Sequence, residues 1–219
     1  MISSTLLDRY AQALLQTLLM VGASMLIAIV AGMLLAIVLT LTAPRGLYPR
    51  PLLHKTLSTA INMFRAIPFI ILLVALLPVT RFIVGTTLGA WAAVVPLSAN
   101  LIPFFARIVQ VNLGGVEPGL IEAARAMGCK RSQIVHHVLL PEALPGILGG
   151  VTVTAIAMID MSAMAGAVGG GGLGDMAIRY GYERYETQVM IVVIFILVAL
   201  VSVIQLVGEY FARRVDRKH

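Results

Sequence analysis

The chain has few charged residues, few aromatic residues and a single cysteine. Of its 219 residues, 12% are charged and 6% are aromatic, whereas 59% are hydrophobic. Ordinary soluble domains carry about 25% charged residues, so this composition excludes that class and indicates an integral membrane protein. Cys129 alone cannot form an intramolecular disulfide or a multi-cysteine metal site. No metal site is predicted from His136 and His137 either, since adjacent residues point to different faces of a helix.

Lysine is also scarce, and its positions exclude a nucleotide-binding loop. A Walker A loop requires Gly-Lys-Ser/Thr, but none of Lys55, Lys130 and Lys218 follows a glycine. The chain is therefore predicted not to be an enzyme that hydrolyses ATP, and to carry no cofactor of its own. The run 169–174 formally matches G-x-G-x-x-G, yet it follows a predicted membrane helix rather than a strand. A flexible outer loop or close helix packing explains it better than a dinucleotide site.

Long uncharged runs predict the membrane spans. About 20 apolar residues cross the hydrocarbon core of a bilayer. Uncharged runs cover residues 10–44, 82–106, 143–159 and 187–208. A fifth segment, residues 57–80, is apolar apart from Asn62 and Arg65 and contains two prolines. The sequence thus predicts an all-α membrane protein with five transmembrane helices, in which residues 1–219 form a single transmembrane domain.

The distribution of positive charge predicts how these spans are oriented. Short cytoplasmic loops are enriched in Lys and Arg. With the N-terminus outside and the C-terminus inside, eleven of these residues lie on the cytoplasmic side, four lie outside and Arg65 lies within a span. This asymmetry predicts an N-out/C-in topology. The formal charge of +6 is then explained by orientation and by anionic membrane lipid, and no nucleic-acid partner is expected.

A polar interval of about 36 residues separates the third and fourth predicted spans. Glu117-Pro118-Gly119 can open a short helix, and Gly128 can close it in a left-handed conformation. Ser132 can begin a second helix, which is expected to end before Pro141. This order of helix formers and breakers predicts a structured cytoplasmic element at about residues 112–141 rather than a linker.

The first of these short helices contains a recognisable spacing. E-A-A, three residues, G, nine residues and I-x-L-P resembles the cytoplasmic coupling loop of binding-protein-dependent ABC importer permeases, with Val138 where the family usually has Ile. Alanines allow close approach of a partner, Glu122 suits the helix dipole and could pair with a partner's arginine, and Gly128 permits the turn. An ordinary amphipathic surface helix is the alternative. The predicted ATPase-coupling residues are Glu122, Ala123, Ala124, Arg125, Gly128, Leu140 and Pro141.

The resemblance extends over roughly residues 60–182, through segments 62–73, 119–123, 139–146 and 165–174. These look like the methionine importer permease, the membrane subunit of a type I ABC importer. The resemblance implies a multi-pass subunit with the type I importer permease fold, in a bacterial cytoplasmic (inner) membrane, that translocates methionine (L, D or both) inward by alternating access. The implied partners are a second copy of the chain, two ABC ATPase subunits that hold ATP and Mg, and an extracytoplasmic methionine-binding lipoprotein.

The fourth predicted span contains one ionisable residue among methionines. If the helix begins near Leu144, Asp160 lies about 24 Å along it, beyond the membrane midplane. A charge at that depth tends to face a cavity or a partner, and it could meet the ammonium group of a zwitterionic substrate. The substrate-path candidates are Met158, Asp160, Met161, Ser162 and Met164. Alternatively, Asp160 pairs with Arg65 or is a hydrogen-bonded acid, and the methionines are adaptable packing between helices.

Three other functions remain open from the residues alone. A permease for another amino acid or organosulfur solute would share the same motifs. A passive channel would explain the spans but not the coupling spacing. An intramembrane aspartyl protease would use Asp160 with Asp175, which lies in a G-x-G-D sequence. Such an enzyme needs two carboxylates in one site, whereas fifteen residues on one helix would separate these by about 22 Å.

Overall fold

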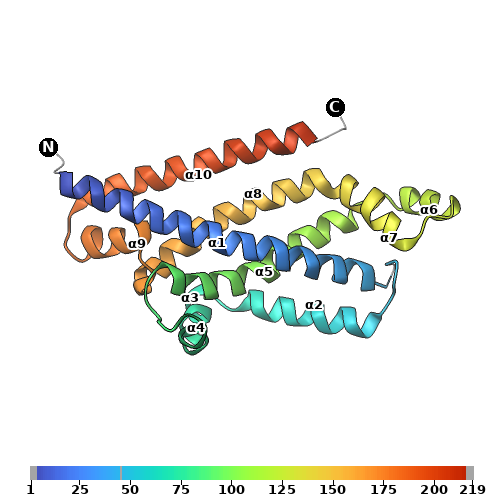
Figure 1. Cartoon of the computed structure of the whole chain (residues 1–219), viewed down its shortest axis with the longest axis horizontal. Coiled ribbons are helices and arrows are strands. Elements are labelled where there is room, and N and C mark those ends of the chain that lie inside the picture. The colour runs from blue at the N-terminus through green and yellow to red at the C-terminus, as the bar shows by residue number, and fades with distance from the viewer. Residues whose placement is uncertain (1–3, 45, 216–219) are drawn as a thin grey trace.

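The computed structural model describes residues 4–44 and 46–215, and within these ranges every regular element is a helix. In chain order the α-helices are α1 (Ser4–Thr42), α2 (Pro51–Ala66), α3 (Phe69–Ala75), α4 (Leu77–Val84), α5 (Ala90–Gly114), α6 (Pro118–Ala126), α7 (Arg131–Ile134), α8 (Leu140–Ala165), α9 (Gly172–Met176) and α10 (Thr187–Val215). Three π-helical segments cover Val135–Leu139, Gly166–Gly170 and Ala177–Tyr182. The long helices α1, α5, α8 and α10 run side by side, and α6 and α7 project at one end (Figure 1).

Four helices of the described chain are long and apolar enough to cross a membrane, and a bent pair makes up to five. The four contain α1, α5, α8 and α10, and the pair is α2 with α3, bent by 100°. The prediction of one spanning helix over residues 57–80 is therefore wrong in its continuity, because α2, α3 and α4 divide this segment. Pro68 disfavours a helical residue before it, and Ile67 is extended, with φ −78° and ψ 123°.

The third predicted span, residues 82–106, is displaced along the chain. Helix α5 covers Ala90–Gly114 and continues through Arg107, whose guanidinium donates a hydrogen bond of 2.9 Å to Gln110. Arg107 ends the uncharged run, but a helix can leave the membrane without ending. Two prolines, Pro96 and Pro103, lie inside α5.

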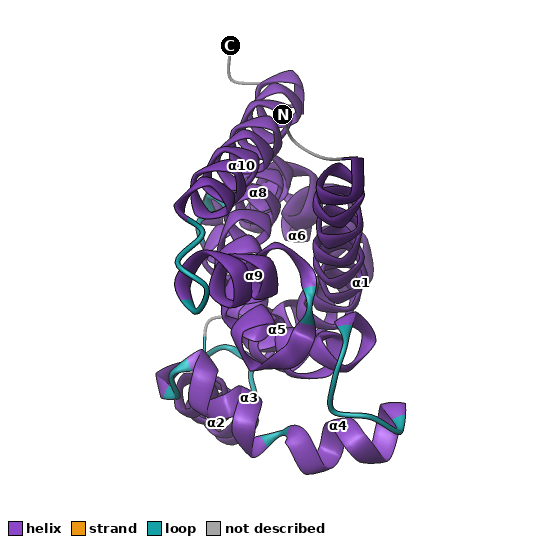
Figure 2. Ribbon diagram, turned by 90° about the vertical axis from the view of Figure 1, so that its left-hand side faces the viewer, coloured by secondary structure: helices purple, strands orange, loops and turns teal. Residues whose placement is uncertain are grey.

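Helices α1 and α5 share the most extensive contact in the fold. Gly32 allows the backbones to approach, since a Cβ at this position would lie 3.0 Å from the carbonyl oxygen of Ile102. Small residues at helix contacts permit the close packing that holds membrane helices together. The largest fully buried side chains along this contact include Met20, Leu39, Leu97, Leu101 and Phe105. Seen from the end of the bundle, α2, α3 and α4 lie together beyond α5 (Figure 2).

The glycine-rich run after α8 is a tight turn that packs closely. Gly169, Gly171 and Gly172 have φ values of +92°, +79° and +79°, conformations that side chains disfavour. The turn directs α9 back against α1. There, the Gly172 N–H donates to Gln16 Oε1 (2.8 Å) and the Leu173 N–H donates to Thr17 Oγ1 (2.9 Å). The first amides of α9 are thus satisfied by α1 side chains, and close packing is the interpretation that holds for this segment.

The polar interval between α5 and α8 folds largely as predicted, with one difference. Helix α6 begins at Pro118 and is followed by Gly128 with φ +78°. The second short helix does not end before Pro141, because α7, the π-helical segment Val135–Leu139 and α8 follow one another without a break. The Leu140 N–H bonds to the Val135 carbonyl in the π-helical segment, and this irregular hydrogen-bond pattern accommodates Pro141, which has no N–H, directly after it.

Candidate functional site

Helix α6 is held against the end of the bundle by its small residues. Ala124 is only 3% exposed and belongs to the same buried cluster as Val116, Ile134 and Leu139. Ala123 and Met127 lie on the outward side, and Met127 is 76% exposed. The structure therefore brings Glu122, Ala123, Ala124, Arg125 and Gly128 together on one short helix and its turn. Within this group Ala124 packs into the chain itself, so a partner would meet Ala123 rather than Ala124.

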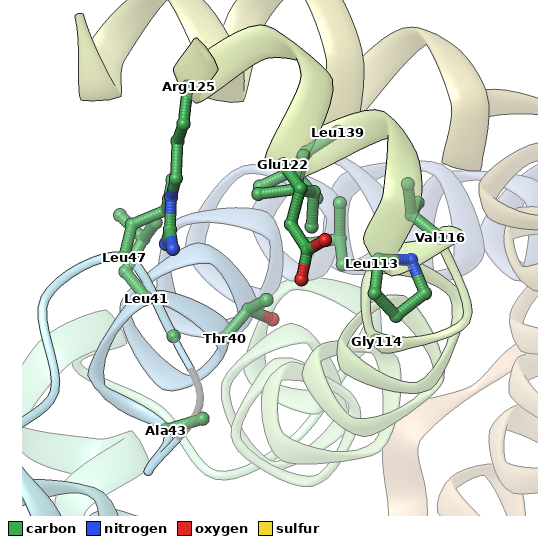
Figure 3. Close-up of a pocket in the computed structure, with 13 residues that line it drawn as sticks. Thr40, Leu41, Ala43, Leu47, Leu113, Gly114, Val116, Glu122, Arg125 and Leu139 are labelled. Atoms are coloured by element: carbon green, nitrogen blue, oxygen red, sulfur yellow. The ribbon is translucent and has the colours of Figure 1, made fainter.

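A pocket of about 510 Å³ lies between α6 and the ends of α1 and α5. Figure 3 shows the Glu122 and Arg125 side chains pointing toward this pocket, with Thr40 and Leu113 among the opposite walls. Both charged side chains remain exposed, as is usual for charged residues that have no buried partner. Glu122 thus points toward the bundle, and its pairing with a partner's arginine stays a prediction.

The turn after α6 is fixed by backbone hydrogen bonds. The Gly128 N–H donates to the Arg125 carbonyl (3.0 Å), and the Cys129 N–H donates to the Ala124 carbonyl (3.1 Å). These bonds satisfy the last carbonyls of α6, as in other helix ends that use a left-handed residue. The Lys130 N–H then donates to Gln133 Oε1 (2.7 Å), which starts α7. As a result α6 and α7 form a defined helical hairpin at the end of the bundle.

Leu140 and Pro141, the other predicted coupling residues, lie at the start of α8. Leu140 is half-buried and packs against the cluster that also anchors Ala124. Val138, at the position of the family's usual Ile, packs against the same cluster. Pro141 is exposed. This part of the motif therefore joins the helical hairpin to α8 and presents only Pro141 to a partner.

The five substrate-path candidates on α8 divide between packed and open positions. Met158 is fully buried among α1 and α5 residues, and the buried Ser162 hydroxyl donates to the Ile159 carbonyl at 2.7 Å. Met161 is half-buried and its sulfur accepts a hydrogen bond of 3.1 Å from Asn100. Asp160 and Met164, one helical turn apart, are exposed. Only these last two lie on an open face in this structure.

Asp160 forms no ion pair or hydrogen bond with another residue that the structure describes. The suggested partner, Arg65, instead lies with its guanidinium 6.0 Å from the centre of the Phe104 ring. Asp175 pairs with Arg179 at 2.8 Å rather than with a second carboxylate, which argues against an aspartyl protease. An unpaired acid on a spanning helix is costly in lipid, so its face is expected to meet a partner or a water-filled path.

Asn100 was not predicted as a site residue, although it lies buried on α5 beside Met161. Its position in an uncharged span is a signal that could have identified it, because buried amides in membranes require a partner. Over residues 4–44 and 46–215, no group of three His, Cys, Asp or Glu side chains could hold a metal ion.

Comparison with known families matches residues 28–217 to the binding-protein-dependent transport system inner membrane component. The chain is 46% identical to the probable D-methionine transport system permease protein MetI of Vibrio cholerae, over 96% of this chain and 94% of that protein. It is 41% identical to the methionine import system permease protein MetP of Bacillus subtilis, over 82% of this chain and 81% of that protein.

The fold also matches a solved transporter. A structure of the MetNI methionine ABC transporter in an inward-facing conformation superposes with a TM-score of 0.96 at 44% sequence identity, covering 98% of this chain and 100% of the other. Its chain and this one therefore share the helix arrangement throughout. This chain belongs to the binding-protein-dependent transport system inner membrane components, as the permease subunit, and not the ATPase, of an ABC importer in the inner membrane.

Proposed function

We propose that this chain moves methionine (L, D or both) into the cell by alternating access. The observation that carries the proposal is the match over 98% of the chain, at 44% identity, to the permease of a methionine transporter. The proposed partners are a second copy of the chain, two ABC ATPase subunits that bind ATP and Mg, and an extracytoplasmic methionine-binding lipoprotein. In such an assembly the ATPases would supply the energy, and the chain would supply the path.

The proposed orientation places five spans in the membrane with the N-terminus outside and the C-terminus inside. The bent pair of α2 and α3 counts as the second span. Support comes from the opposite placement of the N-terminal end of α1 and the hairpin of α6 and α7, which lie at the two ends of the bundle (Figure 1). Arg125, Lys130 and Arg131 lie on or beside that hairpin, which suits the positive cytoplasmic side.

The connection from α6 to the spans suggests how movement of an ATPase would reach the path. Helix α7, the π-helical segment Val135–Leu139 and α8 follow one another without a break, so a displacement of the hairpin is transmitted along α8 to Asp160. The π-helical segment Val135–Leu139 gives this helix an adjustable turn beside the hairpin. On the facing helix α5, two interior prolines weaken the hydrogen-bond ladder and permit bending. These features favour rocking of α5 against α8 between inward-open and outward-open states.

Uptake by the reconstituted transporter tests the proposed cargo. The chain would be placed in liposomes with its genome-neighbouring ATPase and binding protein, and ATP-dependent entry of labelled methionine would be compared with that of other amino acids. Selective methionine uptake is expected. Uptake of another amino acid or of an organosulfur solute would retain the mechanism and replace the cargo. Flux that does not require ATP would contradict the importer and indicate a passive channel.

Asp160→Asn is expected to lower methionine uptake about tenfold, because the variant removes the negative charge of an exposed acid deep in α8 while keeping the size of the side chain. A charge-assisted contact with a ligand contributes about 1.5–3 kcal/mol, and about 1.4 kcal/mol corresponds to a factor of ten. The initial rate of uptake at saturating binding protein would be measured beside ATP hydrolysis.

Asp175→Asn is the matched control for this change. It removes an acid whose ion pair with Arg179 is partly exposed, and exposed pairs contribute little. Its uptake is expected to stay near that of the unmodified chain. If both variants transport equally well, Asp160 has a structural role only.

A further inference from the structure

The pocket beneath α6, called here the α6 pocket, has charge of both signs at its rim. Glu122 and Arg125 lie three residues apart on α6, and both side chains point toward the pocket (Figure 3). Residues at this spacing could pair with each other, yet no ion pair joins them among the described residues. The remaining walls are mostly apolar and include Leu41, Leu113 and Leu139. The pocket therefore offers an anionic and a cationic contact above an apolar surface.

The α6 pocket continues into a second pocket of about 470 Å³. Gly46, Leu47 and Arg125 line both, so Arg125 lies between them. The second pocket adds Arg131, whose guanidinium lies 4.6 Å from the centre of the Tyr48 ring. Among the residues that the structure describes, the two pockets together form a groove with one carboxylate toward one end and two guanidinium groups toward the other. Guanidinium groups are well suited to phosphate.

The groove lies at the ends of two candidate membrane spans, and the proposed orientation places these ends at the cytoplasmic surface of the membrane. Its walls come from the end of α1, which stops at Thr42, and from the end of α5, which stops at Gly114. Lipid headgroups occupy this boundary, and their acyl chains extend from it along apolar helix faces. A ligand at this level would have its polar part beside α6 and its apolar part beside the leucines of α1 and α5.

We propose that the groove binds the headgroup of a phospholipid that carries a primary ammonium group, as phosphatidylethanolamine does. The ammonium group donates to Glu122, the phosphate meets Arg125 and Arg131, and the glycerol end of the acyl chains lies on the apolar wall. An anionic lipid without an amine leaves Glu122 without a cation. A choline headgroup has the same charge but cannot donate a hydrogen bond from its nitrogen. The lipid would thus connect α6 to the bundle. This proposal rests on the proposed orientation, which places the groove at the membrane surface.

Native mass spectrometry of the assembled transporter with its ATPase subunits tests the proposal. Delipidated complex would be titrated with phosphatidylethanolamine, phosphatidylcholine and phosphatidylglycerol. One phosphatidylethanolamine per copy of the chain is expected to bind about tenfold more tightly than either other lipid, as expected for one charge-assisted hydrogen bond. Glu122→Gln is expected to bring phosphatidylethanolamine down to the level of phosphatidylcholine.

A pocket-filling variant separates this site from lipid that coats the surface. Gly114 lines the α6 pocket, and a Cβ there has no atom within 4 Å, so Gly114→Phe can place a ring in the pocket without a clash at Cβ. It should abolish the preferred lipid. Gly22→Phe is the matched control, because Gly22 is also an exposed helical glycine with open space around its Cβ. The control should retain the lipid.

Three outcomes would overturn the proposal. They are equal binding of the three lipids, survival of the preferred lipid in Gly114→Phe, and displacement of the lipid by free methionine, which would assign the groove to an amino acid. Lipid binding is counted without transport, so a failure of the proposed cargo in the uptake experiment leaves this result unchanged.

Discussion

Gly128→Val is expected to lower ATP-driven uptake at least tenfold while the membrane-spanning part remains folded. Gly128 has φ +78°, and a β-branched residue in that conformation costs about 1–3 kcal/mol. Relief of this strain would open the turn that the Gly128 and Cys129 amides close onto α6. If the hairpin adopts another conformation, α6 no longer fits its site on an ATPase subunit. A loss of about 1.4 kcal/mol in the free energy of this association weakens the affinity tenfold. Since Gly128 is exposed and outside the candidate spans, folding should be spared.

Gly128→Asn is the matched control, because asparagine tolerates the left-handed conformation better than other residues with a side chain. The space around the Cβ of residue 128 is open, so neither variant is limited by contacts within the chain. Uptake, co-purification of the ATPase and thermal unfolding would be measured for both. Loss of uptake in both variants would mean that a partner contacts this position directly. Normal uptake and normal association in Gly128→Val would remove the turn from the coupling mechanism.

The helix that carries the coupling residues was predictable because its signals are local. Pro118 fits only the first turn of a helix, and Gly128 supplies the left-handed residue that ends it. These preferences act within a few residues and do not depend on the rest of the fold. The inward packing of Ala124 was not predictable in the same way. It depends on where Ile134 and Leu139 lie after the chain has turned back.

The ends of the spans were less predictable, because charge reports the cost of burial in lipid and not the end of a helix. Arg107 interrupts an apolar run but continues α5, since its side chain reaches Gln110 and the helix extends beyond the apolar region. The break at Ile67 and Pro68 shows the converse. An apolar run can contain two helices when a proline fixes the residue before it in an extended conformation.

The substrate-path candidates illustrate a further limit of periodicity. Met158, Met161 and Met164 follow one another every three residues, yet their exposure increases from fully buried to 45% exposed. Periodicity defines relative directions on a helix, whereas the packing of α8 against α1 and α5 decides which direction is the interior. The Asp160 side chain is exposed because it points away from the face of α8 that packs against α1 and α5. Nothing in the neighbouring sequence predicts which face of α8 this is.

The close crossing of α8 and α9 depends on glycines, which let the two backbones approach each other, more than on any side-chain contact in this segment. A Cβ at Gly174 would overlap the backbone of Ala163, and a Cβ at Gly166 would lie 2.5 Å from the Asp175 nitrogen. Backbone atoms cannot move aside as the end of a flexible side chain can. In addition, separating α9 from α8 would pull the Gly172 and Leu173 amides away from Gln16 and Thr17. The turn, α9 and α1 therefore form one unit.

Gly174→Ala is expected to destabilise the protein by about 3 kcal/mol or more, at the upper end of the cost of overpacking, and to reduce the yield of monodisperse transporter severely. Gly149→Ala is the control. Gly149 lies on α8, where a Cβ would meet no atom within 4 Å apart from the neighbouring backbone of its own helix, and alanine favours a helix over glycine by about 1 kcal/mol. Thermal unfolding and size-exclusion profiles of the purified complexes would be compared. If Gly174→Ala unfolds at the same temperature as the control, the two backbones can separate at little cost, and the glycine-rich turn is not what holds α9 in place.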